Sequence, residues 1–322
     1  MCGGCLFEGF ARIWTVVGLA GDLPVDRPLG VMIAGERVAL FRDASGAPAA
    51  LLDRCPHRGV ALSLGCVRRG EIACPFHGWR FGADGRNLMT PWNPDAKREQ
   101  LSAVALPARE NGGLLFVHTA PGEAESAPEP PDATLRDGVR LCSQSVFWNA
   151  HWTRVMENML DSPHVPFVHA RSFGGPISRL LAQRPDAKMT VRWEPQPYGA
   201  KICSAIDGEP RPAPLDYRYP NLMELTLDAP KRLFRIFAVC IPVSDRQTRL
   251  LLITARDFLR APIFDALFRW SNRKIAEEDR RIVESSRPPF APDPGEERSV
   301  ESDAATLAFR RIYRQKLMGS RV

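Results

Sequence analysis

The stretches Cys55-Pro56-His57-Arg58-Gly59 and Cys74-Pro75-Phe76-His77-Gly78-Trp79 decide the fold of the first third of the chain. Each stretch supplies one cysteine and one histidine and then turns at a glycine, so the pattern is C-x-H, sixteen residues, then C-x2-H. Two thiolates and two imidazoles can hold a [2Fe–2S] cluster, with the cysteines on one iron and the histidines on the other. Neutral imidazoles remove negative charge and raise the reduction potential of the cluster. The two stretches therefore predict an electron-transfer centre.

Zinc is the competing occupant, because mixed cysteine and histidine sites are common for zinc. Zinc-finger spacing, however, groups the two cysteines together and the two histidines together. Here two similar loops each supply one cysteine and one histidine, which suits a cluster bound between the tips of the two loops. The sequence therefore favours the cluster over zinc.

A second set of metal-binding side chains lies in Glu157-Asn158-Met159-Leu160-Asp161-Ser162-Pro163-His164-Val165-Pro166-Phe167-Val168-His169. The stretch Asn149–Met159 has the pattern of an amphipathic helix, and the prolines that follow stop a regular helix from continuing. The two histidines are therefore expected at a helix end and in an irregular turn. Two histidines and a carboxylate on one face of an iron leave three positions open, as in non-haem Fe(II) oxygenases. Outside both motifs, His118 and His151 are expected to be structural.

Together the two motifs resemble those of the catalytic (α) subunit of Rieske non-haem iron oxygenases. The family pattern N-x2-D-x2-H-x4-H is matched by Asn158, Asp161, His164 and His169. The residues within and around this pattern are most similar to those of the single-subunit-type oxygenases that include vanillate and dicamba demethylases. The resemblance spans the chain from about Phe10 to Glu284.

The resemblance implies a role for each motif residue. The cluster ligands would be Cys55, His57, Cys74 and His77, and two iron ligands would be His164 and His169. Asp161 would bridge a cluster histidine to an iron histidine and, with Asn158, belong to the catalytic machinery. In the family the electron crosses to a neighbouring subunit, which implies a homotrimer. Val60 and Phe76 stand where respiratory-type Rieske proteins carry a second pair of cysteines, so the likeness is to the domains of oxygenases and their ferredoxins.

The third iron ligand is expected on a helix near the C-terminus. Apolar residues at helical spacing between Phe264 and Ile282 mark its core-facing stripe, and Glu278 and Asp279 flank that stripe on either side. Periodicity does not choose between these two carboxylates. The family pattern E-D-x3-V-E, which the chain matches from Glu278 onward, selects Asp279, and Asp303 is the next candidate.

Length and composition indicate a globular protein of two domains, with 322 residues of which 44% are hydrophobic. No apolar run is long enough to span a membrane, and the N-terminus lacks the regions of a secretory signal. Eight cysteines in a chain of this length do not suggest a disulfide scaffold, and Cys2 and Cys5 form only an isolated C-x2-C. The thiols that the cluster does not use are expected to be free in a reducing cytoplasm.

The net charge of +6 comes from scattered lysines and arginines, without a basic helix or an aromatic-interleaved patch. Nucleic-acid binding is therefore not expected. Basic residues close in sequence to the cluster loops suggest a surface that steers an acidic ferredoxin or reductase: Arg68, Arg69, Arg80, Arg86, Lys97 and Arg98.

The predicted fold class is α+β. Residues 1–120 are expected as an antiparallel β domain for the [2Fe–2S] cluster, 121–132 as a Pro-, Glu- and Ala-rich linker, and 133–322 as the catalytic domain with the mononuclear iron. Strands are expected at Val31–Ile33, Val38–Phe41, Ala49–Leu52, Glu71–Cys74, Leu114–Val117, Lys188–Trp193, Lys201–Ile206, Leu222–Leu227, Leu233–Ile241 and Leu250–Ala255. Later helices at Ile263–Ser286 and Ser302–Met318 suggest a sheet that wraps a helix, and the resemblance implies the same helix-grip domain.

The expected function is the terminal oxygenase of a multicomponent monooxygenase. It would use O2 and electrons from an NAD(P)H-dependent reductase to hydroxylate or oxidatively demethylate a hydrophobic or aromatic substrate. The sequence has no flavin or NAD fingerprint, so the reductase would be a separate protein. The expected partners of this chain are a ferredoxin, a flavin reductase or both. A ring-dihydroxylating dioxygenase, a desaturase or cyclase acting on a natural product, and a simple Rieske electron carrier stay open. Four residues are weighed as lining for the substrate pocket, although core packing is the simpler interpretation: Tyr217, Met223, Phe234 and Phe237.

Overall fold

The computed structural model describes residues 6–124, 126–211, 213–293 and 295–318, so Cys2 and Cys5 lie outside the described residues. The chain divides into two compact units, Met1–Leu135 and Arg136–Val322. The segment 121–132, predicted as a linker, is part of the first unit. There Trp14 Nε1 donates to the Ser126 carbonyl at 2.7 Å, and Asn111 Nδ2 donates to the Pro128 carbonyl at 3.3 Å. In the part of the chain that the structure describes, no helix combines the length and the apolar character needed to cross a bilayer.

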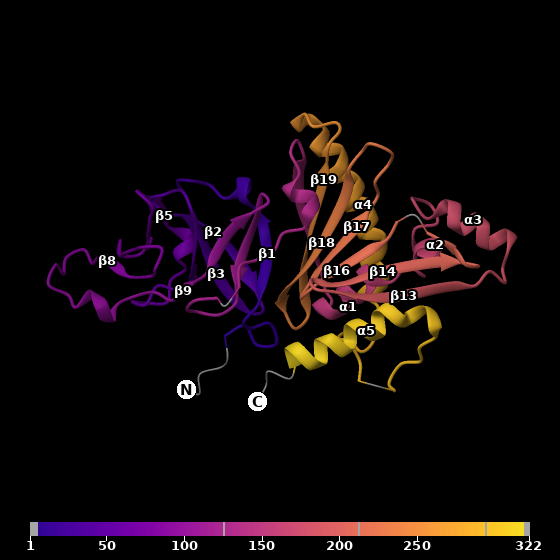
Figure 1. Ribbon diagram of the computed structural model, residues 1–322. Helices are drawn as coiled ribbons and strands as arrows, with labels where there is room; N and C mark the ends of the chain where they lie inside the picture. Colours follow the sequence, from indigo (N-terminus) through magenta and orange to yellow (C-terminus); the bar gives the residue numbers. More distant parts are fainter. Residues whose placement is uncertain (1–5, 125, 212, 294, 319–322) are drawn as a thin grey trace. The chain divides into compact units, whose positions relative to one another are not determined.

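The first unit contains three small antiparallel sheets (Figure 1). The first has the order β1 (Trp14–Leu19), β11 (Leu114–His118), β10 (Ala108–Asn111). The second has the order β2 (Leu29–Ile33), β3 (Glu36–Arg42), β4 (Pro48–Leu52), β9 (Ala105–Leu106). The third has the order β5 (Cys66–Arg68), β6 (Glu71–Ala73), β7 (Arg80–Phe81), β8 (Asn87–Met89). A tight turn links β2 to β3, with positive φ at Ala34 and Gly35.

The second unit is built on one eight-stranded antiparallel sheet with the order β12-β19-β18-β17-β16-β14-β13, and β15 pairs with β14. Its strands are β12 (Arg140–Trp148), β13 (Met189–Gln196), β14 (Gly199–Ile206), β15 (Glu209–Pro210), β16 (Leu215–Arg218), β17 (Leu222–Thr226), β18 (Phe234–Ser244) and β19 (Gln247–Arg256). Its helices are α1 (Trp152–Leu160), α2 (Val165–Val168), α3 (Gly175–Gln183), α4 (Asp265–Val283) and α5 (Ala304–Tyr313). Five elements of this unit are not predicted from the sequence: β12, β15, β16, α2 and α3.

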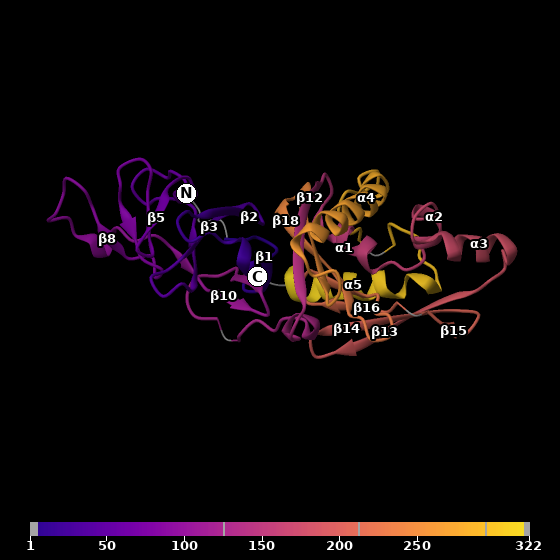
Figure 2. The same ribbon diagram turned by 90° about the horizontal axis from the view of Figure 1, so that it is seen from above.

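The helices α1, α4 and α5 pack against this sheet. Helix α1 contacts β17, β18 and β19, helix α4 contacts β12, and helix α5 contacts β13. Figures 1 and 2 show α1 between the other two helices, both of which it contacts. This arrangement confirms the predicted α+β class with a helix-grip domain. The buried residues of α4 are Asp265, Asn272, Ala276, Asp279 and Val283, so three of the five are polar.

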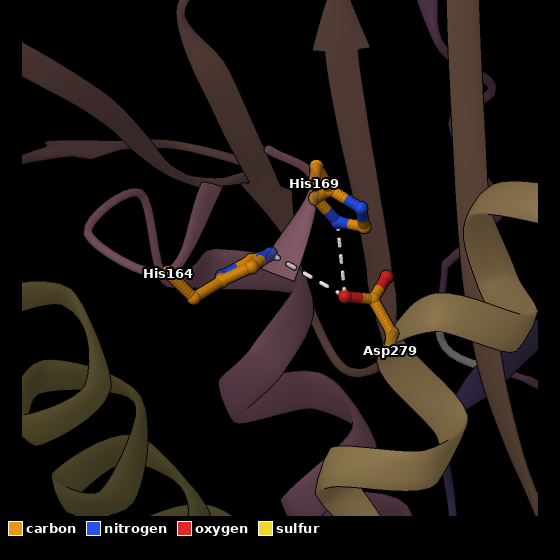
Figure 3. Close-up of side chains that lie close together, drawn as sticks. All are labelled: His164, His169 and Asp279. Carbon is orange, nitrogen blue, oxygen red and sulfur yellow. Dashed lines mark ion pairs between the residues drawn. The ribbon is translucent and has the colours of Figure 1, made fainter. Parts of the chain in front are cut away.

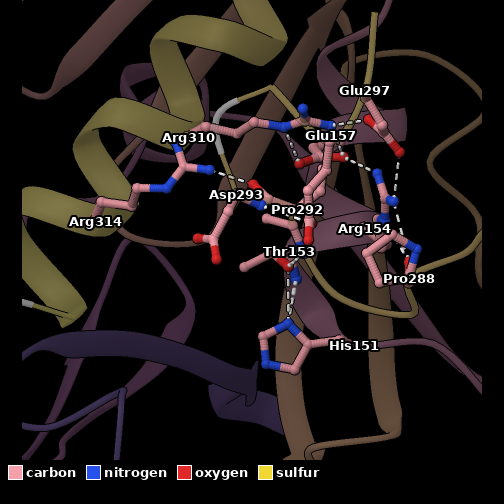
Figure 4. A network of polar contacts seen from close by, with 12 residues as sticks. His151, Thr153, Arg154, Glu157, Pro288, Pro292, Asp293, Glu297, Arg310 and Arg314 are labelled. Carbon is pink, nitrogen blue, oxygen red and sulfur yellow. Dashed lines mark hydrogen bonds and ion pairs between the residues drawn. The ribbon is translucent and has the colours of Figure 1, made fainter.

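A buried ionic network holds α1 in place (Figure 4). Glu157, on α1, accepts hydrogen bonds from Arg310 Nε on α5 at 2.7 Å and from Arg154 Nη1 at 2.9 Å. Both arginines also donate to Glu297, Arg154 Nη2 at 2.6 Å and Arg310 Nη2 at 2.8 Å. The Arg154, Glu157 and Arg310 side chains are each less than a tenth exposed, so the charges compensate one another away from water. The network fixes the helix that leads into the second motif.

Candidate active site

The two cysteine–histidine loops of the first unit have the same backbone scheme. Gly59 N–H donates to the Cys55 carbonyl at 2.8 Å, and Gly78 N–H donates to the Cys74 carbonyl at 3.0 Å. Both glycines have φ near +70°, the left-handed region that favours glycine. The repeated glycines of the motif therefore serve two equivalent turns, as the sequence suggests.

The donor atoms of these loops fit a metal cluster. Cys55 and Cys74 are free and buried, and the His57 and His77 ring centroids lie 4.7 Å apart. The Trp79 ring stacks on His57, with ring centroids 4.5 Å apart and an interplanar angle of 4°. Nδ1 of His57 is buried and has no hydrogen-bond partner in the described structure. Such an atom costs free energy unless it binds something, and a metal ion satisfies it.

Burial, together with the adjacent Cys74 thiol, raises the pKa of the Cys55 thiol to about 11. The Cys55 thiol therefore keeps its proton when nothing cationic is near it. Binding of iron would displace this proton, since thiolates are the metal-binding form of cysteine.

His164 and His169 bracket the four-residue helix α2, one directly before it and the other directly after it. Pro166 lies in the first turn of α2, where a missing N–H costs little. The expectation of a helix end followed by an irregular turn is thus confirmed in outline, although a short helix forms between the two histidines. The close spacing brings both imidazoles to the same side of α4.

Asp279 completes a group of three with these histidines (Figure 3). Its Oδ1 lies 3.0 Å from His169 Nε2 and 3.5 Å from His164 Nε2, and the three potential ligand atoms all lie within 4.8 Å of one another. The Asp279 and His169 side chains are only 6% and 2% exposed. Asp279 Oδ1 accepts no hydrogen bond from the described residues. A buried carboxylate oxygen that faces two imidazole nitrogens fits a divalent cation of the kind that two histidines and a carboxylate bind.

The other candidate carboxylates lie elsewhere. Asp303 Oδ2 accepts from the Val300 N–H at 2.8 Å and is outside the group of three. Glu278 Oε2 lies 2.8 Å from His169 Nδ1, the nitrogen on the far side of the ring, and accepts a 2.8 Å hydrogen bond from Ser172 Oγ. The sequence singles out Glu278 only as a rival ligand, whereas the structure gives it a different contact with the same histidine.

Asp161 makes the matching contact with the other histidine. Its Oδ2 lies 3.2 Å from His164 Nδ1 and accepts the His164 backbone N–H at 3.0 Å. Each imidazole therefore has one carboxylate on Nδ1 and Asp279 near Nε2. A carboxylate on Nδ1 favours the tautomer that leaves Nε2 free to bind a metal. Asn158 and Asp161 line the same cavity, and the Nδ2 atom of Asn158 is buried without a hydrogen-bond partner in the described structure.

The two remaining histidines have structural contacts, as expected. His151 caps the N-terminus of α1, and its Nδ1 lies 2.7 Å from Thr153 Oγ1. The His118 ring packs against Trp14, with ring centroids 5.3 Å apart.

A cavity of about 720 Å³ opens beside the group of three, between the sheet and α4. Most of its lining is apolar and comes from β16 to β19, α3 and α4. The polar lining outside the histidines consists of Asn158, Asp161, Ser162, Ser204, Arg211, Ser271, Asn272 and Asp279. Of the four pocket residues weighed from the sequence, Met223 and Phe234 line the cavity. Tyr217 and Phe237 do not line it and are buried in the core.

A β domain with two cysteine–histidine loops and a helix-grip domain with two histidines and an aspartate define an iron-dependent oxygenase with its own electron-transfer domain. Residues 13–102 match the model of the Rieske [2Fe-2S] domain. Residues 148–318, more than half of the chain, match the model of the vanillate O-demethylase oxygenase C-terminal domain. The chain belongs to the Rieske non-haem iron oxygenases, whose cofactors are a [2Fe–2S] cluster and a mononuclear iron.

Similar proteins carry varied oxygenase names. The chloroplastic chlorophyllide a oxygenase of Chlamydomonas reinhardtii is 28% identical over 291 residues, which cover 86% of this chain and 43% of the relative. The 4beta-methylsterol monooxygenase of Methylococcus capsulatus is 26% identical over an alignment 326 residues long, which covers 94% of this chain and 87% of the relative. The chain spans about half the length of the chlorophyllide a oxygenases that it matches. Dicamba monooxygenase bound to dicamba has the same fold, with a TM-score of 0.75 at 21% identity over 96% of this chain and 98% of that chain.

Proposed function

We propose that this chain is the oxygenase component of a multicomponent monooxygenase that hydroxylates or oxidatively demethylates a hydrophobic or aromatic substrate. The observation that carries the proposal is the group His164, His169 and Asp279 on the wall of a largely apolar cavity of about 720 Å³. A cavity of this size suits a small organic molecule held next to a metal ion.

Seven side chains would hold the two iron groups. The [2Fe–2S] cluster would be bound by Cys55, His57, Cys74 and His77, and the mononuclear iron by His164, His169 and Asp279. When bound, the two groups supply electrons and activate O2 for the insertion of one oxygen atom into a C–H bond, the other leaving as water. Where that C–H bond belongs to a methyl on oxygen or nitrogen, the hydroxylated product loses formaldehyde, and net demethylation results.

The protein's own side chains orient the imidazoles and exclude water. Asp161 and Glu278 accept from Nδ1 of His164 and His169, so that each Nε2 stays unprotonated and directed at the same point. The apolar lining keeps bulk water from the reacting C–H bond and binds the hydrocarbon part of the substrate. Asn158 lines the same cavity as Asp161, and its buried amide Nδ2 has no hydrogen-bond partner among the described residues.

The partners proposed are a ferredoxin or a flavin reductase that draws electrons from NAD(P)H, and two further copies of this chain in a homotrimer. Basic residues next to the cluster loops, such as Arg68 and Arg69, support an acidic electron donor. The six described cysteines are free, which supports a reducing compartment such as the cytoplasm. The trimer can be tested by mixing a Cys55→Ser variant with a His164→Ala variant under conditions of subunit exchange. Partial recovery of activity is expected, and none is expected from either variant alone.

The experiment that tests the function is a single turnover of the chemically reduced protein with labelled ¹⁸O₂ and a panel of aryl methyl ethers and alkyl aromatics, each with and without a carboxylate group. One labelled oxygen atom in the product, or formaldehyde release at the same rate as cluster oxidation, is expected. Asp279→Ala should keep the cluster and give no product. If no compound in the panel accelerates cluster oxidation or incorporates label, the proposed function is wrong. Two labelled atoms in one product would assign dihydroxylation instead.

A further inference from the structure

The cavity next to His164, His169 and Asp279 has one basic side chain that these residues do not use. Among the described residues that line it, Arg211 is the only arginine, and no lysine lines it. No carboxylate of the described residues lies within ion-pair distance of the Arg211 guanidinium. The side chain is partly exposed, so in the free protein water solvates it. A guanidinium without a protein partner on an apolar wall indicates that the partner is a ligand.

A second unpaired polar group lies beside it. Arg211 directly follows β15, and its backbone N–H donates to the Ser204 carbonyl of β14 at 2.8 Å. Residues opposite each other on paired strands direct their side chains to the same face of the sheet. Both Ser204 and Arg211 line the cavity, and the Ser204 hydroxyl has no hydrogen-bond partner among the described residues. The guanidinium and the hydroxyl therefore form one polar patch on the inner face of the sheet.

The rest of this wall is apolar. Residues next along the chain and on the following strands, Ala213, Leu215, Met223 and Leu225, line the same cavity. Asp279, by contrast, comes from α4, on a different wall. A ligand that fits both parts has a hydrocarbon body and one anionic group. Guanidinium matches carboxylate best, because its planar fork donates two parallel hydrogen bonds.

We propose that Arg211 and Ser204 form a carboxylate-binding subsite, and that the substrate is a hydrophobic carboxylic acid. The Arg211 guanidinium and the Ser204 hydroxyl bind the carboxylate, while the apolar body extends along the sheet toward the two histidines and Asp279. This inference rests on the proposed function, because it specifies the substrate class of the same cavity. Charge pairing at Arg211 also keeps the carboxylate from binding the metal in place of O2.

The test compares pairs of compounds that differ only in charge. The iron-loaded protein is titrated with biphenyl-4-carboxylate, 3-phenoxybenzoate and naphthalene-2-carboxylate, and with the three corresponding primary amides. Binding is read from the change in the EPR signal of the Fe(II)–nitrosyl adduct. The wild-type protein should bind acids more tightly than amides. Arg211→Met should weaken acid binding by about ten- to hundredfold and leave amide binding unchanged.

Arg192→Met is the matched control. Arg192 lies on β13, is exposed, and does not line the cavity, so its loss should change neither series. Arg211→Lys keeps the charge without the planar fork and should show an intermediate loss of acid binding. Ser204→Ala should show a smaller loss, and these two variants decide the question if Arg211→Met does not fold.

Equal binding of acids and amides by the wild-type protein, no binding of any acid, or acid binding that is unchanged in Arg211→Met or Arg211→Lys would each overturn the carboxylate subsite. Those results leave the oxygenase function standing if neutral compounds still accelerate cluster oxidation. A wild-type protein that gives no Fe(II)–nitrosyl signal would instead contradict the proposed function.

Discussion

Glu278 and Asp279 are neighbours on α4, yet they approach opposite nitrogens of one imidazole. Glu278 Oε2 lies 2.8 Å from Nδ1 of His169, and Asp279 Oδ1 lies 3.0 Å from Nε2. Successive residues of a helix are turned by about 100°, so the pair can hold a ring that lies between their directions. Glu278 therefore orients the His169 ring, whereas Asp279 lies on the metal-binding side of that ring.

Glu278 is therefore expected to be a positioning residue. Glu278→Gln keeps the size of the side chain but removes the anion that favours the Nδ1–H tautomer of His169, so iron affinity should fall by about 10- to 100-fold. Ser172→Ala removes the hydrogen bond that Ser172 donates to Glu278 and should have a smaller effect in the same direction. Iron affinity and the EPR signal of the nitrosyl adduct measure both. Glu277→Gln, on the exposed side of α4, is the control, and equal effects from Glu277→Gln and Glu278→Gln would contradict the positioning role.

Asp279 is expected to be the carboxylate ligand of the mononuclear iron. Asp279→Ala should lose this iron and keep the cluster, so that metal analysis falls from about three irons per chain to about two. Asp303→Ala should keep all of the iron, because Asp303 caps a short helical turn outside the group of three. If Asp303→Ala loses the iron while Asp279→Ala retains it, the ligand assignment is wrong.

The sequence predicts the local parts of the site better than its distant parts. Both histidines and Asp161 lie within nine positions of one another, so one motif contains them. Choosing between Glu278 and Asp279 needs the tertiary contact with His169. The predicted core-facing stripe of this helix is wrong at both ends, because Phe264 and Ile282 are exposed, and the buried face includes Asp279 itself. The subsite at Arg211 has no motif, since it depends on the register that pairs Ser204 with Arg211. The strand β12 is not predicted, because it is an edge strand and most of its residues are partly or fully exposed, which weakens the alternation of apolar residues.

Asp161 is expected to control electron transfer in addition to orienting His164. Asp161→Asn keeps the shape of the side chain but replaces the anion that contacts His164 Nδ1 with a neutral amide. The cluster should be retained and iron affinity should fall no more than in Glu278→Gln, whereas turnover of the fully iron-loaded protein should fall by orders of magnitude. Stopped-flow absorbance of the reduced cluster, mixed with substrate and O2, should show slow oxidation. An oxidation rate equal to that of the wild-type protein would exclude this role.

The cluster loops provide a separate prediction. His57 Nδ1 is a buried atom without a partner, so His57→Cys should place a thiolate where a neutral imidazole is expected to bind iron. The added negative charge should lower the reduction potential or cause loss of the cluster, and either result appears in a redox titration followed by EPR. His118→Cys, far from the loops in sequence, should change neither property. Stoichiometric zinc without labile sulfide in the wild-type protein would rule out the cluster.

Acid stability of the second unit is expected to depend on Asp265, at the start of α4. Hydrogen bonds from Arg140, at 2.6 Å, and from the fully buried Arg256 outweigh the effect of burial and hold the pKa of Asp265 at about 2. Because the folded pKa lies below the unfolded value of about 4, this stabilisation is complete above pH 4 and is lost as the pH falls through 2. Asp265→Asn should therefore lower the free energy of unfolding at pH 7 by at least about 2 kcal/mol, since it also leaves Arg256 without its anion. In urea titrations the difference from the wild-type protein should shrink between pH 4 and pH 2. A difference that stays constant over that range would show that the charge of Asp265 is not what stabilises α4.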